Sequence, residues 1–345
     1  MIKTAILIPA YEPDGKLINL INELVEYDKK VIVVNDGSNS KYDSIFQSVS
    51  NKGATVINHE FNRGKGAALK TGIEWCYNNG YEGVVTADSD GQHAVKDIIN
   101  ICKKVEEDND KLILGVRKIK NMPAKSKFGN TLTRFLFKVL YGVDISDTQT
   151  GLRGIPLKNR KDGLLNLSGN RYEYEMNMLI YAQRLDYTIE EIDIETIYYD
   201  QNEGSHFNPI KDGIKIYAVL FKNIPSFLIS SLASFLIDYG IFNILVYAIG
   251  VGVLFSTVLA RIVSASFNYC FNKKIVFKKS GKRYNAINYI KLACTILAIN
   301  CCLIYFLVEV LGLNAYLAKI LVEVILYSVS FATQNMWAYS RERKK

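Results

Sequence analysis

The sequence predicts an α/β domain built on a mostly parallel, Rossmann-like sheet, followed by a domain of four membrane-spanning helices. Two observations support this division. Over residues 1–222, short apolar runs alternate with amphipathic stretches, as strands and helices do in an α/β fold. Over residues 223–345, long apolar runs dominate instead. The overall composition of 49% hydrophobic residues in a chain of 345 therefore averages over two different regions.

Strands are expected in the first region wherever a short apolar run lies between helical patterns. They cover residues 4–10, 30–36, 54–58, 83–88, 111–116 and 188–197. Ligands of open α/β sheets bind beyond the carboxyl ends of the strands. The polar residues at these ends should therefore meet in one crevice. They lie at 9–12, 35–38 and 88–90.

Four apolar segments in the second region are each near the roughly 20 residues that cross a bilayer. They cover residues 226–249, 252–272, 287–312 and 315–339. Lysines and arginines gather between the second and third segments and at the C-terminus, and basic residues mark the cytoplasmic side. We therefore expect a multi-pass protein of the cell membrane, with both termini and the first domain in the cytoplasm. Buried helical hairpins of a soluble protein would be less consistent with this charge asymmetry.

Two further segments combine apolar residues at helical spacing with lysine or arginine, at 125–141 and 210–224. Basic amphipathic helices of this kind can lie on anionic membrane surfaces. The alternative is a helix that packs on the core and leaves its charged face in water. We expect both segments to be apposed to the membrane.

Two isolated charges, Asp238 and Arg261, lie near the middle of the first two apolar segments. These segments run in opposite directions, so the two residues fall at similar depth. Charges in the middle of a bilayer are unfavourable and face the bundle interior. We expect a contact between Asp238 and Arg261, with separate polar partners such as Asn268 or Asn300 as the alternative.

Several common site patterns are missing from the sequence. It has no GxGxxG after the first strand, no GxxxxGK[ST], and no cysteine spacing typical of a metal site. No signal peptide is visible, and the six cysteines are expected to be reduced packing residues. No nucleic-acid partner is expected, and a homo-oligomer stays open.

Two carboxylates one residue apart, Asp88 and Asp90, follow the apolar strand at 83–88. Like charges at this distance repel, so a cation is expected between them. A calcium loop of the EF-hand type is disfavoured because His93 stands where that loop needs glycine. Mg²⁺ and Mn²⁺ favour oxygen ligands and share them with substrate phosphates. The pattern therefore predicts Mg²⁺ or Mn²⁺ held by Asp88, Asp90 and the neutral oxygen of Gln92, bridging to a diphosphate.

Five motifs occur in a fixed order: LIPAYEPD at 7–14, VVNDGS at 33–38, NRGKGAAL at 62–69, ADSDGQH at 87–93 and DTQTGLRG at 147–154. Together they resemble the family 2 glycosyltransferases, in the dolichyl-phosphate mannose synthase-like branch that acts on polyprenyl phosphates. The resemblance covers roughly residues 3–215 and implies a GT-A fold. The last third resembles the four-helix GtrA-type membrane domain, through RIVSASFNYCFNKKIVF at 261–277.

The resemblance implies a role for each matching residue. The residues expected to bind the nucleotide of the donor are Pro9, Tyr11, Glu12, Asp36, Asp88, Ser89 and Asp90. The residues expected near the reaction centre are Asp147, Arg117 and Arg153. The residues expected to hold the acceptor phosphate are Arg117, Lys125, Lys127, Arg134 and Arg153. Simpler alternatives are a turn at Asp36-Gly37 and a helix cap at Asp147.

These roles predict an inverting enzyme that moves a hexose from a donor such as GDP-mannose or UDP-glucose to a polyprenyl phosphate. A phosphate oxygen is already anionic near neutral pH, so it needs little help from a general base. Two alternatives stay open. One is transfer to another lipid acceptor, and the other is a lipid-sugar flippase whose attached nucleotide-binding domain is not catalytic.

Overall fold

The computed structural model describes residues 2–118, 122–158, 160–185, 187–197, 208, 210–251, 253–277 and 284–339. The chain divides into two compact units. The first unit consists of Met1–Phe137 and Asp144–Leu220, and the second of Lys138–Val143 and Phe221–Lys345. Each unit is described by itself below.

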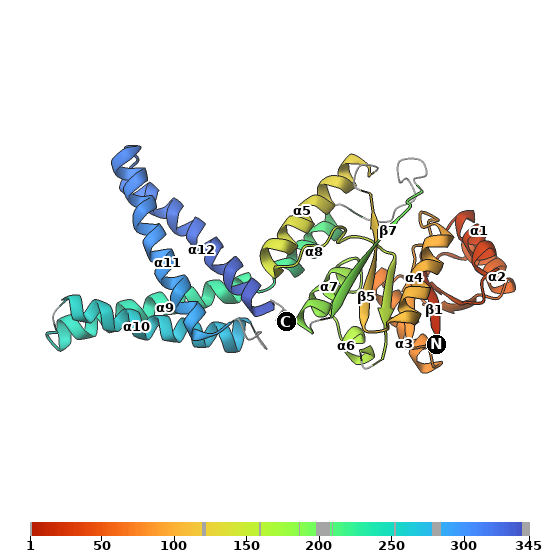
Figure 1. Ribbon diagram of the computed structural model, residues 1–345, viewed down its shortest axis with the longest axis horizontal. Coiled ribbons are helices and arrows are strands. Elements are labelled where there is room, and N and C mark those ends of the chain that lie inside the picture. Colours follow the sequence, from red (N-terminus) through yellow and green to blue (C-terminus); the bar gives the residue numbers. More distant parts are fainter. Residues whose placement is uncertain are drawn as a thin grey trace. The chain divides into compact units, whose positions relative to one another are not determined.

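The first unit contains a seven-stranded sheet in the order β3-β2-β1-β4-β6-β5-β7 (Figure 1). Its strands are β1 (Thr4–Ala10), β2 (Lys30–Asn35), β3 (Thr55–Asn58), β4 (Gly83–Thr86), β5 (Lys111–Arg117), β6 (Arg153–Pro156) and β7 (Thr188–Ile194). Strand β6 runs antiparallel to both of its neighbours, and every other pairing is parallel. The mostly parallel sheet expected from the sequence is therefore confirmed.

Helices cover both faces of this sheet, because alternate residues of the strands point to opposite sides. Ile6 and Ile8 of β1 belong to a core with α1 (Gly15–Leu24), α2 (Asp43–Asn51) and α4 (Val95–Glu107). On the other face, α3 (Lys65–Asn78) lies so close to β1 that a Cβ on Gly72 would be 2.1 Å from the Leu7 side chain. Helices α6 (Lys161–Leu165) and α7 (Glu173–Arg184) lie beside α3.

Strand β6 was not expected from the sequence. It is four residues long and contains glycine and proline, so its local pattern is that of a loop. It becomes a strand because β4 and β5 each hydrogen-bond to one of its edges. This tertiary pairing outweighs the weak local preference.

Helices α5 and α8 lie where the two amphipathic segments were expected. Helix α5 (Ala124–Tyr141) exposes Phe128 and Phe135, which are 72% and 62% exposed, and buries Phe137. Helix α8 (Lys211–Leu220) exposes Ile214 and buries Leu220. Each helix therefore has one apolar face in the core and leaves other large apolar side chains uncovered.

The second unit is helical, with α9 (Ile224–Asn243), α10 (Val253–Phe271), α11 (Ala286–Tyr305) and α12 (Ala315–Tyr339). The first three continue into π-helical turns at Ile244–Ala248, Asn272–Val276 and Phe306–Val310. In the described part of the chain, one helix, Ile224–Ala248, is long and apolar enough to cross a membrane, and 6% of its most apolar window is buried. Four membrane spans therefore stay a prediction.

Neutral polar side chains link these helices. The Asn268 amide group donates hydrogen bonds to the hydroxyls of Ser230 and Ser234 of α9, at 3.3 and 3.0 Å. Its oxygen accepts from Asn272 and from the Tyr289 hydroxyl, both at 2.9 Å. We call this group of side chains the Asn268 network.

Asp238, expected to contact Arg261, accepts a hydrogen bond from the Ser264 hydroxyl at 3.0 Å. The Arg261 side chain lies outside the described residues. Their pairing therefore stays a prediction.

Candidate active site

The carboxyl ends of β1, β2, β4 and β5 lie at one edge of the sheet because these strands are parallel. Strand β6 is antiparallel, so the segment that precedes it, Asp147–Leu152, enters at the same edge between β4 and β5. Thr86 of β4 donates a hydrogen bond to the Gly151 carbonyl at 2.7 Å. The unexpected strand is thus the element that brings the last sequence motif to the others.

A cavity of about 360 Å³ lies at this edge. Its lining residues come from five separate stretches of the chain and include most of the expected donor-binding set. They are Pro9, Ala10, Tyr11, Asp36, Asn62, Gly64, Lys65, Asp88, Ser89, Asp90, Arg171 and Tyr172. Expected residues Glu12 and Gln92 are not among them. Glu12 instead donates its backbone N–H to the Ser38 hydroxyl at 2.8 Å, and Gln92 donates its own to Asp90 at 3.1 Å.

Asp88 contacts two side chains that the sequence did not assign to it. The Lys65 ammonium lies 2.7 Å from Asp88 Oδ1 and 3.1 Å from Oε1 of Glu175. His93 Nε2 lies 3.3 Å from Asp88 Oδ2. On its other side, Asp88 leaves no room for a side chain at position 151, since a Cβ on Gly151 would be 2.3 Å from Oδ2. The carboxylate is therefore held in one place.

The two carboxylates of the motif differ in their surroundings. Burial would raise the pKa of Asp88, but the charge of Lys65 and the contact with His93 hold this pKa well below its usual range. The pKa of Asp90 is raised, first by burial and then by the charge of Asp88. The negative charge of Asp90 is thus poorly offset by the protein. A bound cation would reduce its repulsion with Asp88.

Asp36, expected to bind the nucleotide, lines the cavity and also holds the backbone of the turn before α3. Its carboxylate accepts hydrogen bonds from the backbone N–H groups of Arg63 and Gly64, at 2.9 and 2.7 Å, and contacts His59 Nδ1 at 2.8 Å. Gly64 has φ +98°, and a Cβ there would lie 2.4 Å from the Asn170 carbonyl oxygen. Asp36 therefore fixes the turn that places Lys65 at the start of α3.

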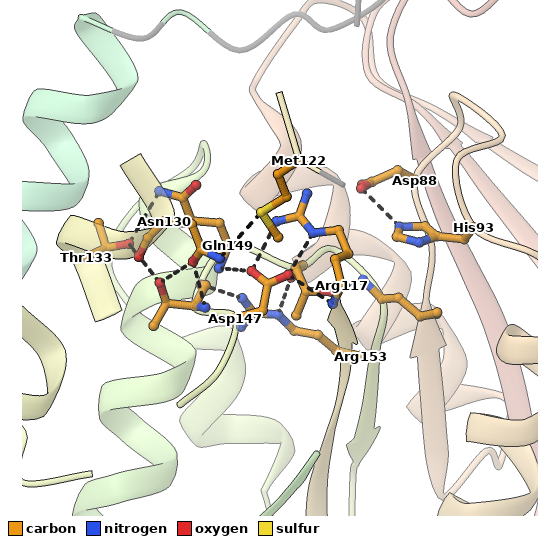
Figure 2. A network of polar contacts seen from close by, with 12 residues as sticks. Asp88, His93, Arg117, Met122, Asn130, Thr133, Asp147, Gln149 and Arg153 are labelled. Carbon is orange, nitrogen blue, oxygen red and sulfur yellow. Dashed lines mark hydrogen bonds and ion pairs between the residues drawn. The ribbon is translucent and has the colours of Figure 1, made fainter. Parts of the chain in front are cut away.

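Arg117 and Asp147 form a bidentate ion pair at the end of β5 (Figure 2). The Arg117 Nε and Nη2 atoms donate to the two carboxylate oxygens of Asp147 at 2.7 and 3.0 Å. The Asp147 side chain is fully buried, whereas that of Arg117 is 18% exposed. Asp147 thus holds Arg117 and does not form the helix cap that was the alternative, and its expected place near the reaction centre stays a prediction.

Arg153 lies buried among backbone carbonyl groups. It is 1% exposed, and its guanidinium donates to the carbonyl oxygens of Thr150, Glu175 and Thr148 at 2.9, 2.7 and 3.4 Å. Three of its five N–H groups are thus used inside the protein, and the expected contact with the acceptor phosphate stays a prediction. Arg153 ties the segment before β6 to the start of α7.

The segment 147–150 is also tied to α5 (Figure 2). Both the backbone N–H and the hydroxyl of Thr148 donate to Asn130 Oδ1 at 3.2 Å, and its hydroxyl lies 2.8 Å from that of Thr133. Gln149 donates its backbone N–H to Asp147 at 3.1 Å. At Asn130 and Thr133 the buried face of α5 is thus polar and holds the segment that carries Asp147, while Phe128 and Phe135 are exposed.

The other expected phosphate ligands are distributed along α5. Lys127 is exposed, whereas Arg134 donates its Nε–H to the Ile145 carbonyl at 3.0 Å. The Lys125 side chain lies outside the described residues. Arg117 and Arg134 are therefore partly accessible and Lys127 is exposed, so the structure leaves these three expected phosphate ligands within reach.

Six residues of the cavity were not predicted as site residues: Ala10, Asn62, Gly64, Lys65, Arg171 and Tyr172. Lys65 lies inside the motif at 62–69, so its position was visible but its partners were not. Arg171 pairs with Asp212 of α8, with Nε 2.8 Å from Oδ1. It reaches the cavity because residues 169–172 pack on the turn at Gly64, about a hundred residues away in the sequence. No local pattern reports such a contact.

The residues present fit a divalent cation bound together with a diphosphate. Among the described residues, no three His, Cys, Asp or Glu side chains form a metal-binding group. Such a group is not required, since Mg²⁺ is usually held by one or two carboxylates and by substrate phosphates. Asp88 and Asp90 both line the cavity, and each carboxylate can accept more contacts than the structure gives it.

Comparison with known proteins gives two family matches on this chain. Residues 5–158 match Glycosyl transferase family 2, and residues 226–339 match the GtrA/DPMS transmembrane domain.

The match with this chain extends over most of the length of these curated relatives. A UDP-N-acetylglucosamine–dolichyl-phosphate N-acetylglucosaminyltransferase of Methanococcus voltae is 31% identical over 232 residues, which is 61% of this chain and 92% of that protein. A dolichyl-phosphate beta-glucosyltransferase of Trichomonas vaginalis is 26% identical over 224 residues, covering 58% of this chain and 66% of that protein. Among solved structures, glucosyl-3-phosphoglycerate synthase from Mycobacterium tuberculosis has 17% identity and a TM-score of 0.48, covering 64% of this chain and 79% of that chain.

The fold and the cavity are those of a glycosyltransferase with a GT-A-like sheet, joined to a membrane domain. The chain belongs to glycosyltransferase family 2 and carries a GtrA/DPMS transmembrane domain after the catalytic one. The resemblance inferred from the five motifs is confirmed.

Proposed function

We propose that this glycosyltransferase moves a hexose from a nucleoside-diphosphate sugar to a polyprenyl phosphate at a membrane surface. The observation that carries the proposal is the charge pattern of the cavity. Asp88 and Asp90 lie on its wall together with the cations Lys65 and Arg171. A diphosphate bound with a divalent cation needs both signs of charge at close range, whereas a neutral ligand needs neither.

Pro9, Tyr11 and Ser89 line the cavity together with the two carboxylates and would bind the nucleotide of the donor. Asp88 and Asp90 would hold Mg²⁺ or Mn²⁺, which would offset the charge of the departing diphosphate. Gln92 acts through its backbone N–H, which donates to Asp90 and orients that carboxylate. Asp36 acts through the turn that carries Lys65.

The contacts of the Asp147 carboxylate support a phosphate as the acceptor. An acceptor hydroxyl would need a carboxylate to remove its proton, but both oxygens of Asp147 bind Arg117. A phosphate oxygen is anionic near neutral pH, since its second pKa is about 6. The named relatives that act on dolichyl phosphate agree with this acceptor. Arg117 and Lys127 would hold the phosphate, and direct displacement would invert the anomeric carbon.

The membrane arrangement proposed for the chain has four spanning helices, with both termini and the catalytic unit on the cytoplasmic side. The match to the GtrA/DPMS transmembrane domain supports it. The exposed apolar side chains of α5 and α8, accompanied by lysines such as Lys127 and Lys215, would rest on the anionic leaflet. The lipid acceptor would thus reach Arg117 from the bilayer.

The test is transfer by the full-length protein in detergent or in liposomes that contain a polyprenyl phosphate. A panel of radiolabelled UDP- and GDP-sugars is supplied, and the organic phase is counted. We expect one donor to give a lipid product that mild acid cleaves. EDTA should remove the activity, and Mg²⁺ or Mn²⁺ should restore it.

The matched variants separate the alternatives. Asp90→Ala should abolish transfer while the protein stays folded, whereas Asp97→Ala, an acidic residue in the first turn of α4, should keep it. A product that resists mild acid would indicate another lipid acceptor. Absence of any labelled lipid across the whole panel would contradict the proposed reaction, and full activity after thorough chelation would contradict the cation site.

A further inference from the structure

Lys65 occupies a position that its own helix does not favour. It is the first residue of α3, where the partial positive charge of the helix N-terminus repels a cation. Its side chain is 16% exposed and lines the cavity. The reason for a lysine here must therefore be sought in residues outside the helix.

These residues are two carboxylates that differ in their access to the cavity. Asp88, 2.7 Å from the ammonium, lines the cavity, whereas Glu175, 3.1 Å away, is 6% exposed and lies in the first turn of α7. The Tyr172 ring centroid, 5.6 Å from the ammonium, adds a further favourable contact. Lys65 thus stands between an outer and an inner carboxylate.

We propose that Lys65 is a counter-ion that exchanges with the divalent cation at Asp88. Without donor, the ammonium neutralises Asp88. When the cation and the diphosphate bind, the ammonium gives up Asp88 Oδ1, keeps Glu175 as its partner and faces the diphosphate. This inference rests on the proposed function, because it assumes that Asp88 is a ligand of the cation.

The charges explain why such an exchange is useful. A divalent cation alone would be repelled by an ammonium that shares its ligand. A diphosphate brings negative charge to the same place. The ammonium therefore repels the cation alone but attracts the diphosphate that binds with it. Lys65 therefore makes cation binding depend on the donor.

The test measures Mn²⁺ binding by the full-length protein, using electron paramagnetic resonance of free Mn²⁺, without nucleotide and with saturating UDP or GDP. Lys65→Met should bind Mn²⁺ about tenfold more tightly than wild type without nucleotide, because the competing charge is gone. The increase in Mn²⁺ affinity that the nucleotide causes should shrink by about tenfold. Lys70→Met is the control. Lys70 lies on the same helix, and its ammonium contacts the Gly169 carbonyl at 2.9 Å. It should behave as wild type.

Two more variants test the charge and the inner partner. Lys65→Arg keeps the charge and should keep the weak Mn²⁺ binding of wild type without nucleotide. Glu175→Gln should weaken that binding about tenfold, because Asp88 becomes the sole carboxylate partner of the ammonium in this cluster. Tighter Mn²⁺ binding by Lys65→Met alone, with Lys65→Arg unchanged, supports the exchange even if Glu175→Gln does not fold.

Mn²⁺ binding by Lys65→Met that is no tighter than wild type would overturn the inference, as would Lys65→Arg behaving like Lys65→Met. The proposed function is judged separately, by wild-type transfer. If the wild type is active but the Mn²⁺ affinities of the Lys65 variants differ from those expected, the exchange is rejected and the proposed function is kept. An inactive wild type rejects the proposed reaction, while Mn²⁺ and nucleotide binding still decide the role of Lys65.

Discussion

The two units of the chain bury polar side chains in different chemical forms. In the catalytic unit they include charged groups: Arg153 is bound by three carbonyl oxygens, and Arg117 is paired with the fully buried Asp147. In the helical unit the Asn268 network consists of neutral amides and hydroxyls. The catalytic unit uses its network to fix the segments beside the cavity, and the helical unit uses its own to join helices.

The difference follows from the surroundings of each network. A buried charge is tolerated where a fixed partner or several dipoles replace water, as around Arg153. In a bilayer the same charge loses more, and neutral groups that hydrogen-bond to each other across helices are the common solution. The comparison predicts large effects from changes in the charged network and small ones from changes in the neutral network.

The largest effect is expected for Arg153→Met. The substitution leaves three carbonyl oxygens without their donor, and the catalytic unit should lose about 3–5 kcal/mol of stability. Denaturation is followed by the fluorescence of Trp75 in a Trp337→Phe background, so that the signal comes from the catalytic unit. A variant as stable as wild type that needs far more acceptor would instead support the phosphate-binding role.

The next effect concerns the Arg117–Asp147 pair. Arg117→Met should lower kcat/KM roughly a hundredfold, as the loss of one positioned donor does in other active sites. Asp147→Asn should have a similar effect, because Arg117 loses its bidentate partner. The double variant should be no worse than Arg117→Met alone. Additive losses would instead indicate that Asp147 acts on the substrate directly.

A smaller effect is expected for Asn268→Leu in the helical unit. The substitution removes four hydrogen bonds, and each is worth about 0.6 kcal/mol in a membrane, so about 2 kcal/mol should be lost. Thermal unfolding in detergent measures it. The control is Ser266→Ala on the same helix, where the hydroxyl bonds to its own backbone at Ile262. Equal losses for both variants would contradict the network.

The smallest effect is expected for Tyr284→Phe. It removes the hydrogen bond from the buried hydroxyl to Gln334 Oε1 at 2.7 Å and leaves the ring stacked on Tyr269. We expect a loss of about 0.6 kcal/mol, measured as a small decrease in the same unfolding temperature. A loss as large as that of Arg153→Met would show that neutral and charged networks do not differ in the way proposed.

Several features of the site could be predicted from the sequence because they depend on local patterns. An apolar run followed by Asp88 and Asp90 places carboxylates at the end of a strand, whatever the neighbouring strand is. The same reasoning placed Pro9, Tyr11 and Asp36 near the cavity. The long apolar runs after residue 222 likewise indicated the second domain, because such runs have no other common use in a chain of this length.

Other features depended on contacts between distant segments. The pattern at 147–154 gave no sign that Arg153 starts an antiparallel strand, because that strand exists only through its pairing with β4 and β5. Once the strand forms, it turns the guanidinium of Arg153 toward backbone carbonyls and leaves Arg117 at the site. Lys65 has Asp88 and Glu175 as its partners, and these two residues come from other parts of the fold. Residue types and spacing therefore determined which chemistry this protein carries. The packing of distant segments decided which cation pairs with which carboxylate, because the strength of an ion pair depends on distance in space and not in sequence.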